Sequence, residues 1–339
     1  MHDRRRAVEQ PAEPNGRSRH GACRRRKRRA GPARGLAARW TDQEKETGRH
    51  VADCMGDVEH RYAAVALGCP ARWLERLPAV VRELEGRWSI TVGDALDTRE
   101  ASCSWVAAAV LADGRPVVLK LGMPHMDGEH EIAGLRFWDG NPTVRLLEGN
   151  EDLGAMLLER CEPGITLRTL PELDQDVVIA GLLRRLWRSP SEPHPFRPLS
   201  DLMAHWTDET MADAERWPDV GIVRAGLQLF KELPCTTPAE TLLATDLHAG
   251  NVLRAQREPW LVIDPKPFLG DPAYDATQHL FNCAARLRSN PGDTIGRFAD
   301  LLGVDGERVH LWTFARAAAE PRDDREEGDW LTLARQLAP

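Results

Sequence analysis

Residues 245–253 read Thr-Asp-Leu-His-Ala-Gly-Asn-Val-Leu, and residues 261–264 follow with Leu-Val-Ile-Asp. The apolar residues on either side of a polar Gln-Arg-Glu-Pro stretch predict two short strands joined by a turn. Asn251 and Asp264 would then lie at adjacent strand ends. With Asp246 in the loop just before them, the pattern predicts three oxygen-bearing side chains in one small volume.

These three side chains suit phosphoryl transfer from ATP. Asp246 can accept the proton of an attacking hydroxyl, while Asn251 and Asp264 supply hard oxygen ligands for Mg²⁺. The D-x-x-x-x-N spacing matches the kinase catalytic loop, and the Ile-Asp after the hairpin stands where kinases place a metal-binding Asp. The spacing alone is a weak signal, since a polar loop between strands can show it by chance. The second carboxylate favours the catalytic interpretation.

The same residues carry a resemblance to a known family. Residues 246–253, 260–266 and 270–275 read DLHAGNVL, WLVIDPK and GDPAYD, which resembles the aminoglycoside phosphotransferases. The Asp-Pro-Lys form of the second motif, with the Trp before it, is similar to the aminoglycoside and hydroxyurea resistance kinase branch of streptomycin 6-kinase-like enzymes. The resemblance extends over residues 60–320.

The resemblance implies an α+β, protein-kinase-like two-lobed fold, with a small antiparallel-sheet N-lobe and a larger, mainly helical C-lobe. We expect a disordered basic extension over residues 1–54, the N-lobe over residues 55–161 and the C-lobe over residues 162–339. ATP would lie between the two lobes.

The chain departs from the family at its catalytic loop. It reads Ala244-Thr245-Asp246, where the family usually reads His-Gly-Asp. The missing His would normally brace the loop, and Thr adds a β-branched side chain where backbone freedom is expected. Because the base and both metal ligands are retained, we expect altered loop rigidity or substrate preference more than loss of catalysis. A non-catalytic pseudokinase stays an alternative.

Lys120 ends the otherwise apolar stretch of residues 116–121, which predicts a strand. In kinases a lysine on this strand contacts the α- and β-phosphates and pairs with a Glu on the next helix. Residues 129–138 supply a helix, and the resemblance assigns the pairing to Glu131, with Glu129 as the second choice. The alternative is a strand-end lysine exposed to solvent.

Two further segments are expected to contact the nucleotide. The loop over residues 93–103 has a single Gly, so it is not the G-x-G-x-x-G of protein kinases, and Ser102 and Ser104 are its candidate phosphate donors. The resemblance also implies a hinge, a segment after the last strand of the sheet whose backbone holds adenine. Glu159 and Cys161 are expected to contact adenine there through main-chain atoms. The Cys161 side chain is expected to pack rather than react.

Helices are expected to make up the C-lobe, because apolar residues recur at intervals of three and four. They are predicted over residues 177–187, 199–206, 210–217, 220–233, 273–288, 294–302, 306–319 and 326–337. Asp271 directly precedes Pro272, which predicts an N-cap. Candidate contacts to a bound acceptor are Glu320, Glu326, Glu327, Asp329 and Trp330. The charged ones are alternatively exposed helix charges, and Trp330 is alternatively part of the core.

The charge of the chain is unevenly distributed. Its net charge is −7, but residues 1–40 hold thirteen Lys or Arg against three acids, which leaves −17 on the remainder. An acidic body attracts a cationic small-molecule acceptor such as an aminoglycoside. A solvated surface that maintains solubility explains the same charge equally well.

The cysteines, the hydropathy and the basic run predict where the protein is located and what it binds. The seven cysteines are scattered without a C-x-x-C pair, which is typical of reduced thiols in the cytoplasm. No apolar run of 18 residues is present, so no membrane association is expected. The basic run at residues 24–29 could bind nucleic acid non-specifically, but an upstream or species-specific extension explains it better. We expect a monomer without a specific nucleic-acid partner.

The sequence therefore predicts an ATP- and Mg²⁺-dependent phosphotransferase that moves the γ-phosphate to an alcohol group of a streptomycin-type aminoglycoside. Two alternatives stay open. The acceptor could be another small hydroxylated metabolite, such as hydroxyurea or a sugar, or the protein could bind nucleotide without catalysis.

Overall fold

The computed structural model describes residues 71–96, 104–321 and 330–339, all within one unit of the chain that spans residues 37–339. Several sequence predictions therefore lie outside the described residues. They are the extension over residues 1–54, the phosphate-donor candidate Ser102, and the acceptor candidates Glu326, Glu327 and Asp329.

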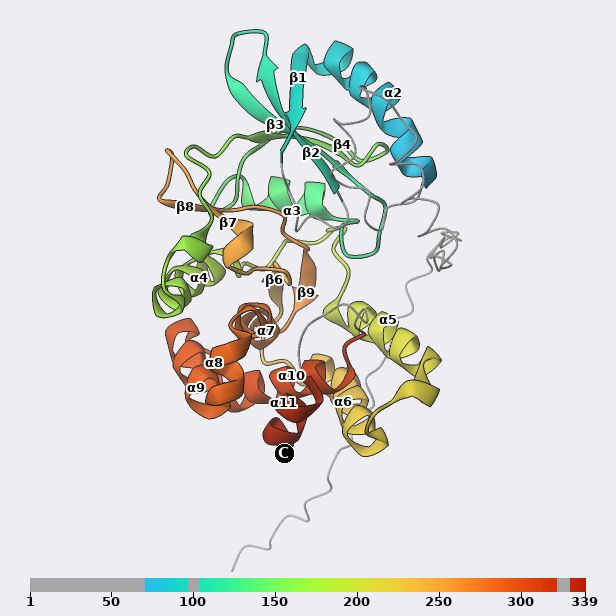
Figure 1. Ribbon diagram of the computed structural model, residues 1–339, viewed down its shortest axis with the longest axis vertical. Coiled ribbons are helices and arrows are strands. Elements are labelled where there is room, and N and C mark those ends of the chain that lie inside the picture. Colours follow the sequence, from blue (N-terminus) through green and yellow to red (C-terminus); the bar gives the residue numbers. More distant parts are fainter. Residues whose placement is uncertain (1–70, 97–103, 322–329) are drawn as a thin grey trace, which may run out of the picture. The chain divides into compact units, whose positions relative to one another are not determined.

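Five strands form an antiparallel sheet in the order β1-β2-β3-β5-β4 (Figure 1). Their bounds are Ile90–Ala95 (β1), Ser104–Leu111 (β2), Pro116–Gly122 (β3), Leu146–Asn150 (β4) and Ala155–Glu159 (β5). Two helices, Ala71–Trp88 (α2) and Glu131–Trp138 (α3), accompany the sheet.

Strand β3 shows how the sequence pattern orients the sheet. Val117, Leu119 and Leu121 are at most 2% exposed and pack in one cluster with residues of α2. Because successive side chains of a strand point to opposite faces, Val118 and Lys120 lie on the other face. Val118 packs there with residues of α3. The alternation therefore directs Lys120 away from α2 and toward the side of the sheet that carries α3.

The remainder of the described chain is mainly helical. Its helices are Glu172–Leu186 (α4), Leu199–Ala212 (α5), Val220–Glu232 (α6), Pro272–Asn282 (α7), Ala284–Ser289 (α8), Pro291–Leu302 (α9), Gly306–Ala319 (α10) and Trp330–Leu337 (α11). Two small antiparallel sheets pair Thr241–Leu243 (β6) with Phe268–Gly270 (β9), and Val252–Arg254 (β7) with Trp260–Val262 (β8). The predicted fold class, a small antiparallel-sheet lobe with a larger helical lobe, is confirmed.

Two secondary-structure predictions were wrong in detail. The helix expected over residues 210–217 is the end of α5 followed by a 3-10 turn, Ala214–Arg216. The helix expected over residues 273–288 is divided between α7 and α8 at Cys283. In both cases the apolar spacing continues past the residue at which the helix ends.

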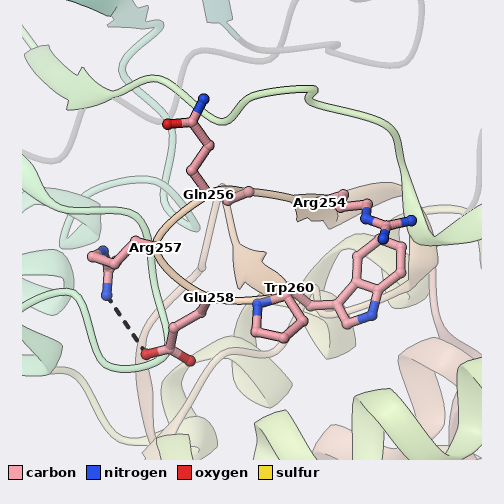
Figure 2. A pocket seen from close by; sticks show the side chains of 7 residues that line it. Arg254, Gln256, Arg257, Glu258 and Trp260 are labelled. Atoms are coloured by element: carbon pink, nitrogen blue, oxygen red, sulfur yellow. Dashed lines mark ion pairs between the residues drawn. The ribbon is translucent and has the colours of Figure 1, made fainter.

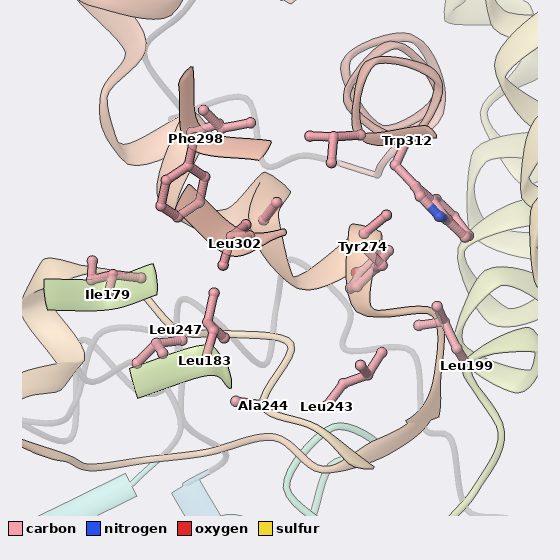
Figure 3. Packing of buried hydrophobic residues seen from close by; sticks show 14 of the residues in the cluster. Ile179, Leu183, Leu199, Leu243, Ala244, Leu247, Tyr274, Phe298, Leu302 and Trp312 are labelled. Atoms are coloured by element: carbon pink, nitrogen blue, oxygen red, sulfur yellow. The ribbon is translucent and has the colours of Figure 1, made fainter. Parts of the chain in front are cut away.

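A large apolar core holds the helical part together (Figure 3). Trp312 and Phe314 of α10 are completely buried, as are Leu183 of α4 and Phe298 of α9. Among the described residues, no helix is both long and apolar enough to cross a membrane.

Candidate active site

The loop between β6 and β7 carries Asp246 and is anchored by apolar neighbours. Leu243, Ala244 and Leu247 are at most 1% exposed and belong to the core of the helical part (Figure 3). Asp246 itself is only half-buried. Burial of the residues around it therefore holds a polar side chain at the edge of a packed core.

The β7–β8 hairpin brings Asn251 and Asp264 together. Val252 pairs with Val262, and the Ile263 N–H donates to the Asn251 carbonyl at 2.9 Å. Asn251 directly precedes β7 and Asp264 follows β8 by one residue. The structure thus places both at adjacent strand ends, the arrangement that the sequence pattern predicts.

Amide groups surround the Asp246 carboxylate. Gln278 Nε2 donates to Oδ1 at 2.8 Å, and Asn251 Nδ2 lies 3.3 Å from Oδ2 while it donates to the Asp246 carbonyl at 2.9 Å. Burial raises the pKa of the Asp246 carboxyl to about 6. A carboxylate with such a pKa is a better proton acceptor than an ordinary aspartate and is still mostly ionised at neutral pH.

Lys120 joins two carboxylates at the face of the sheet. Its Nζ lies 2.6 Å and 2.7 Å from the two Glu131 oxygens and 2.5 Å from Asp264 Oδ1. Lys120 and Glu131 are 5% and 4% exposed, so the alternative of a solvent-exposed strand-end lysine is wrong. Glu129, the second choice as partner, instead bonds Arg197 at 2.9 Å.

Asp264 is surrounded by positive charge. Lys266 Nζ, like Lys120, donates to Asp264 Oδ1. Burial on its own would raise the pKa of the Asp264 carboxyl, but the two ammonium groups outweigh it and hold the pKa below its usual range. Sequence reasoning missed Lys266 as a site residue, although the Asp-Pro-Lys motif contains it.

The donor set fits a magnesium ion. Asp264 offers an ionised carboxylate, and Asn251 offers its amide oxygen, because its Nδ2 is directed to Asp246. Hard oxygen ligands of this kind are what Mg²⁺ prefers. Asn251 and Asp264 are therefore the residues that would hold it.

Another group of potential metal ligands does not suit a cation. Within the ranges that the structure describes, Asp176, His279 and Cys283 form a buried cluster. Arg286, however, donates to both Asp176 oxygens at 2.6 Å. Burial also raises the pKa of the Cys283 thiol to about 11, which keeps it protonated. This cluster is an internal ion-pair network rather than a metal centre.

Asp275 braces the catalytic loop. Its carboxylate accepts hydrogen bonds from the Ala244 N–H at 3.0 Å, the Thr245 N–H at 2.8 Å and Trp187 Nε1 at 2.9 Å. Two main-chain N–H groups of the loop are thereby fixed although the usual His is missing. The Gly-Asp-Pro-Ala-Tyr-Asp motif contains Asp275, but only the tertiary structure reveals this role.

Thr245 adopts a backbone conformation that favours glycine. Its φ is +44°, in the left-handed region that costs a β-branched residue roughly 1–2 kcal/mol. The Thr245 hydroxyl donates to the Lys266 carbonyl at 2.7 Å, which offsets part of that cost. The family's Gly at this position is thus explained by the backbone, and Thr is tolerated because its hydroxyl has a partner.

Replacing Thr245 with valine is expected to lower the free energy of unfolding by about 1–2 kcal/mol. Valine keeps the branched shape but removes the hydroxyl, which leaves the Lys266 carbonyl without this donor. Chemical denaturation measures the effect, and Thr245→Ser, which keeps the hydroxyl, is the control. Equal stabilities for the valine and serine variants would contradict a role for this hydrogen bond.

The nucleotide-contact candidates lie along the sheet. Ser104 is 6% exposed and pairs with Gly122 at the start of β2. The Glu159 N–H donates to the Arg145 carbonyl at 2.9 Å, so its own carbonyl is the main-chain group it could offer to adenine. Burial raises the pKa of the Cys161 thiol to about 12, in accord with a packing side chain.

Arg257 fixes the Glu159 side chain from the β7–β8 turn. Its guanidinium donates to both Glu159 oxygens at 2.9–3.2 Å and to the Gly140 and Thr143 carbonyls at 2.8 and 2.9 Å. Figure 2 shows Arg257 beside Glu258 in a hollow lined by residues 254–260 of this turn. The turn therefore fixes the Glu159 side chain at the end of β5.

The structure describes two of the acceptor candidates, Glu320 and Trp330. Glu320 accepts two bonds from Arg316, both at 2.8 Å, so it is engaged inside the protein and not an exposed charge. Trp330 is half-buried and packs against the core.

The predicted N-cap of α7 is confirmed, because the Asp271 side chain accepts a hydrogen bond from the Ala273 N–H at 3.0 Å.

His248 supports the local structure of the loop. Its Nδ1 accepts a hydrogen bond from the Gly250 N–H at 3.0 Å. Burial lowers the pKa of the ring to about 4, so the imidazole is neutral at physiological pH. The ring therefore stabilises the turn between His248 and Gly250.

A known protein family matches most of this chain. The family described as aminoglycoside/hydroxyurea antibiotic resistance kinase matches residues 87–328. The chain belongs to this family. Its members are named as kinases and phosphotransferases, so this chain is a phosphotransferase, and the branch that the Asp-Pro-Lys motif indicates is confirmed.

Two curated relatives align with most of this chain. Streptomycin 6-kinase of Streptomyces glaucescens is 35% identical over 266 residues, which span 76% of this chain and 85% of the relative. Hydroxyurea phosphotransferase of Kitasatospora aureofaciens is 36% identical over 293 residues, which span 83% and 82%. The description of the family names both aminoglycosides and hydroxyurea.

A solved structure supports the fold. Choline kinase LicA from Streptococcus pneumoniae, in complex with AMP, aligns with this chain at a TM-score of 0.54. The alignment covers 76% of this chain and 96% of LicA at 12% identity, so the likeness concerns the fold alone.

Proposed function

We propose that the protein transfers the γ-phosphate of ATP to an alcohol group of a streptomycin-type aminoglycoside, with Mg²⁺ as the metal ion. The observation that carries this proposal is the convergence of Asp246, Asn251 and Asp264 beside the buried Lys120–Glu131 pair. The streptomycin 6-kinase relative supports the choice of acceptor.

Each side chain has a role in the proposed reaction. Lys120, oriented by Glu131, holds the α- and β-phosphates, and Asn251 and Asp264 hold Mg²⁺, which neutralises phosphate charge when bound. Asp246 orients the acceptor hydroxyl and accepts its proton as the oxygen attacks the γ-phosphorus. Most of the acceleration comes from positioning and charge neutralisation.

The charge of the chain supports a cationic acceptor. The sequence outside residues 1–40 carries a net charge of −17. An acidic protein attracts a cationic small molecule.

Hydroxyurea is the second candidate acceptor. The relative from Kitasatospora aureofaciens, named hydroxyurea phosphotransferase, is as similar to this chain as the streptomycin 6-kinase is. Both reactions would use the same base and metal ligands, so only the acceptor side distinguishes them.

A mass-spectrometric assay tests the proposal. The full chain is incubated with Mg²⁺ and ATP and with streptomycin, hydroxyurea or a neutral sugar, and each acceptor is examined for the mass of one added phosphoryl group. We expect streptomycin to be modified and the reaction to stop when EDTA removes the metal. Modification of hydroxyurea but not streptomycin would select the second candidate. Modification of neither would leave a nucleotide-binding protein and refute the proposal.

A further inference from the structure

Gln278 of α7 contacts the proposed base directly. Its Nε2 donates to Asp246 Oδ1 at 2.8 Å, and its Oε1 accepts from Arg316 Nη2 at 2.9 Å. An amide oxygen and nitrogen are difficult to tell apart by shape, so hydrogen-bond partners must assign them. A guanidinium only donates and an ionised carboxylate only accepts. The amide can therefore satisfy both neighbours in one orientation alone, with its NH₂ toward Asp246.

Arg316 of α10 is held rigidly behind Gln278. It is 4% exposed and donates to both Glu320 oxygens at 2.8 Å and to Thr277 Oγ1 at 2.7 Å. Its guanidinium carbon also lies 5.0–5.4 Å from the ring centroids of Trp206, Tyr274 and Phe281. Such contacts between a cation and aromatic faces are attractive, and they leave the guanidinium little freedom to move.

We propose that Gln278 is a positioning residue for Asp246, and that Arg316 and Glu320 set the direction in which its amide points. The chain of contacts runs Glu320–Arg316–Gln278–Asp246, from the end of α10 to the catalytic loop. This inference rests on the proposed function, because it takes Asp246 as the base.

The two oxygens of Asp246 then have different tasks. Oδ1 is occupied by Gln278 at 2.8 Å, whereas the contact of Oδ2 with Asn251 is longer, at 3.3 Å. Gln278 thereby fixes the rotation of the carboxylate, and Oδ2 is the oxygen that receives the proton of the acceptor. A misplacement of about 1 Å in such a group can lower a rate by roughly a hundredfold.

Gln278→Leu removes the amide without adding a charge beside the base. Leucine can neither donate to Asp246 nor accept from Arg316. We expect kcat to fall by about tenfold to a hundredfold, with the KM for ATP within about twofold of the wild type. Gln228→Leu, which removes an exposed glutamine bonded to Glu232 on α6, is the control.

A purely structural role predicts a different result. Gln278→Leu would then lower only the melting temperature and keep the wild-type kcat. That outcome overturns the proposal.

A double-mutant cycle tests the part of Arg316. Arg316→Met should lower kcat in the wild type but cause no further loss in Gln278→Leu, because the amide that it orients is gone. Equal fold-losses in both backgrounds would show that Arg316 acts independently of Gln278.

A crystal structure of Gln278→Leu provides a measurement that does not depend on turnover. We expect the Asp246 carboxylate to rotate away from the position that it holds in the wild type. An unchanged Asp246 side chain would overturn the inference. If the wild type modifies no acceptor, the proposed function fails, and the comparison of the two crystal structures still decides whether Gln278 positions Asp246.

Discussion

Replacing Asp246 with alanine is expected to lower phosphoryl transfer by about a thousandfold or more while ATP binding is largely retained. The carboxylate is the group placed to take the acceptor's proton, and its raised pKa of about 6 suits it to that task. The Lys120–Glu131 pair does not contact it, so the nucleotide side of the site should persist. Transfer is measured by product formation and ATP binding by calorimetry.

Two variants make this result specific. Asp208→Ala on α5 removes an exposed aspartate and should leave turnover unchanged. Asp246→Asn keeps the shape of the side chain but not its ability to accept the proton, so it should be nearly as inactive as the alanine variant. Normal turnover in either Asp246 variant would remove this residue from its role.

Replacing Lys120 with methionine is expected to impair both stability and nucleotide binding. Glu131 is 4% exposed and has the Lys120 ammonium within 2.7 Å of both its oxygens. Removal of one partner leaves a buried carboxylate uncompensated, which typically costs about 3–5 kcal/mol of unfolding free energy. Loss of the contact to the phosphates should lower the rate by about a hundredfold to a thousandfold. Denaturation and steady-state kinetics measure these effects.

The partner of Lys120 provides the decisive control. The double variant Lys120→Met, Glu131→Gln removes both charges and should be more stable than Lys120→Met, although equally poor in catalysis. Lys231→Met, at an exposed position on α6, should resemble the wild type. Unchanged ATP affinity in Lys120→Met would contradict its contact with the phosphates.

Local patterns made the centre of the site predictable. Asp246, Asn251 and Asp264 lie within one loop and one hairpin, and the apolar residues that flank them determine which way the hairpin pairs. Lys120 was predictable because strand alternation directs it away from α2, and its partner because α3 follows along the chain. The choice of Glu131 over Glu129 came from the resemblance.

Contacts between distant helices were not predictable. Gln278 and Arg316 lie 38 residues apart and meet because α7 and α10 pack together. Nothing in the local sequence distinguishes Arg316 from an exposed helix charge, and Glu320 was accordingly expected to face either solvent or acceptor. Asp275 was likewise visible only as part of a motif until the structure placed it against the Ala244 and Thr245 N–H groups.

The order of residues along the chain was sufficient to indicate the Asp246 loop and the metal-ligand candidates, because hydrophobic periodicity and short-range spacing control local structure, while the kinase-like fold followed from the resemblance that the same motifs carry. The packing of elements farther apart in sequence decided what surrounds that loop: the brace from Asp275 and the amide of Gln278. Such contacts depend on how whole elements bury their apolar faces against one another, and a single sequence read locally carries no record of that arrangement.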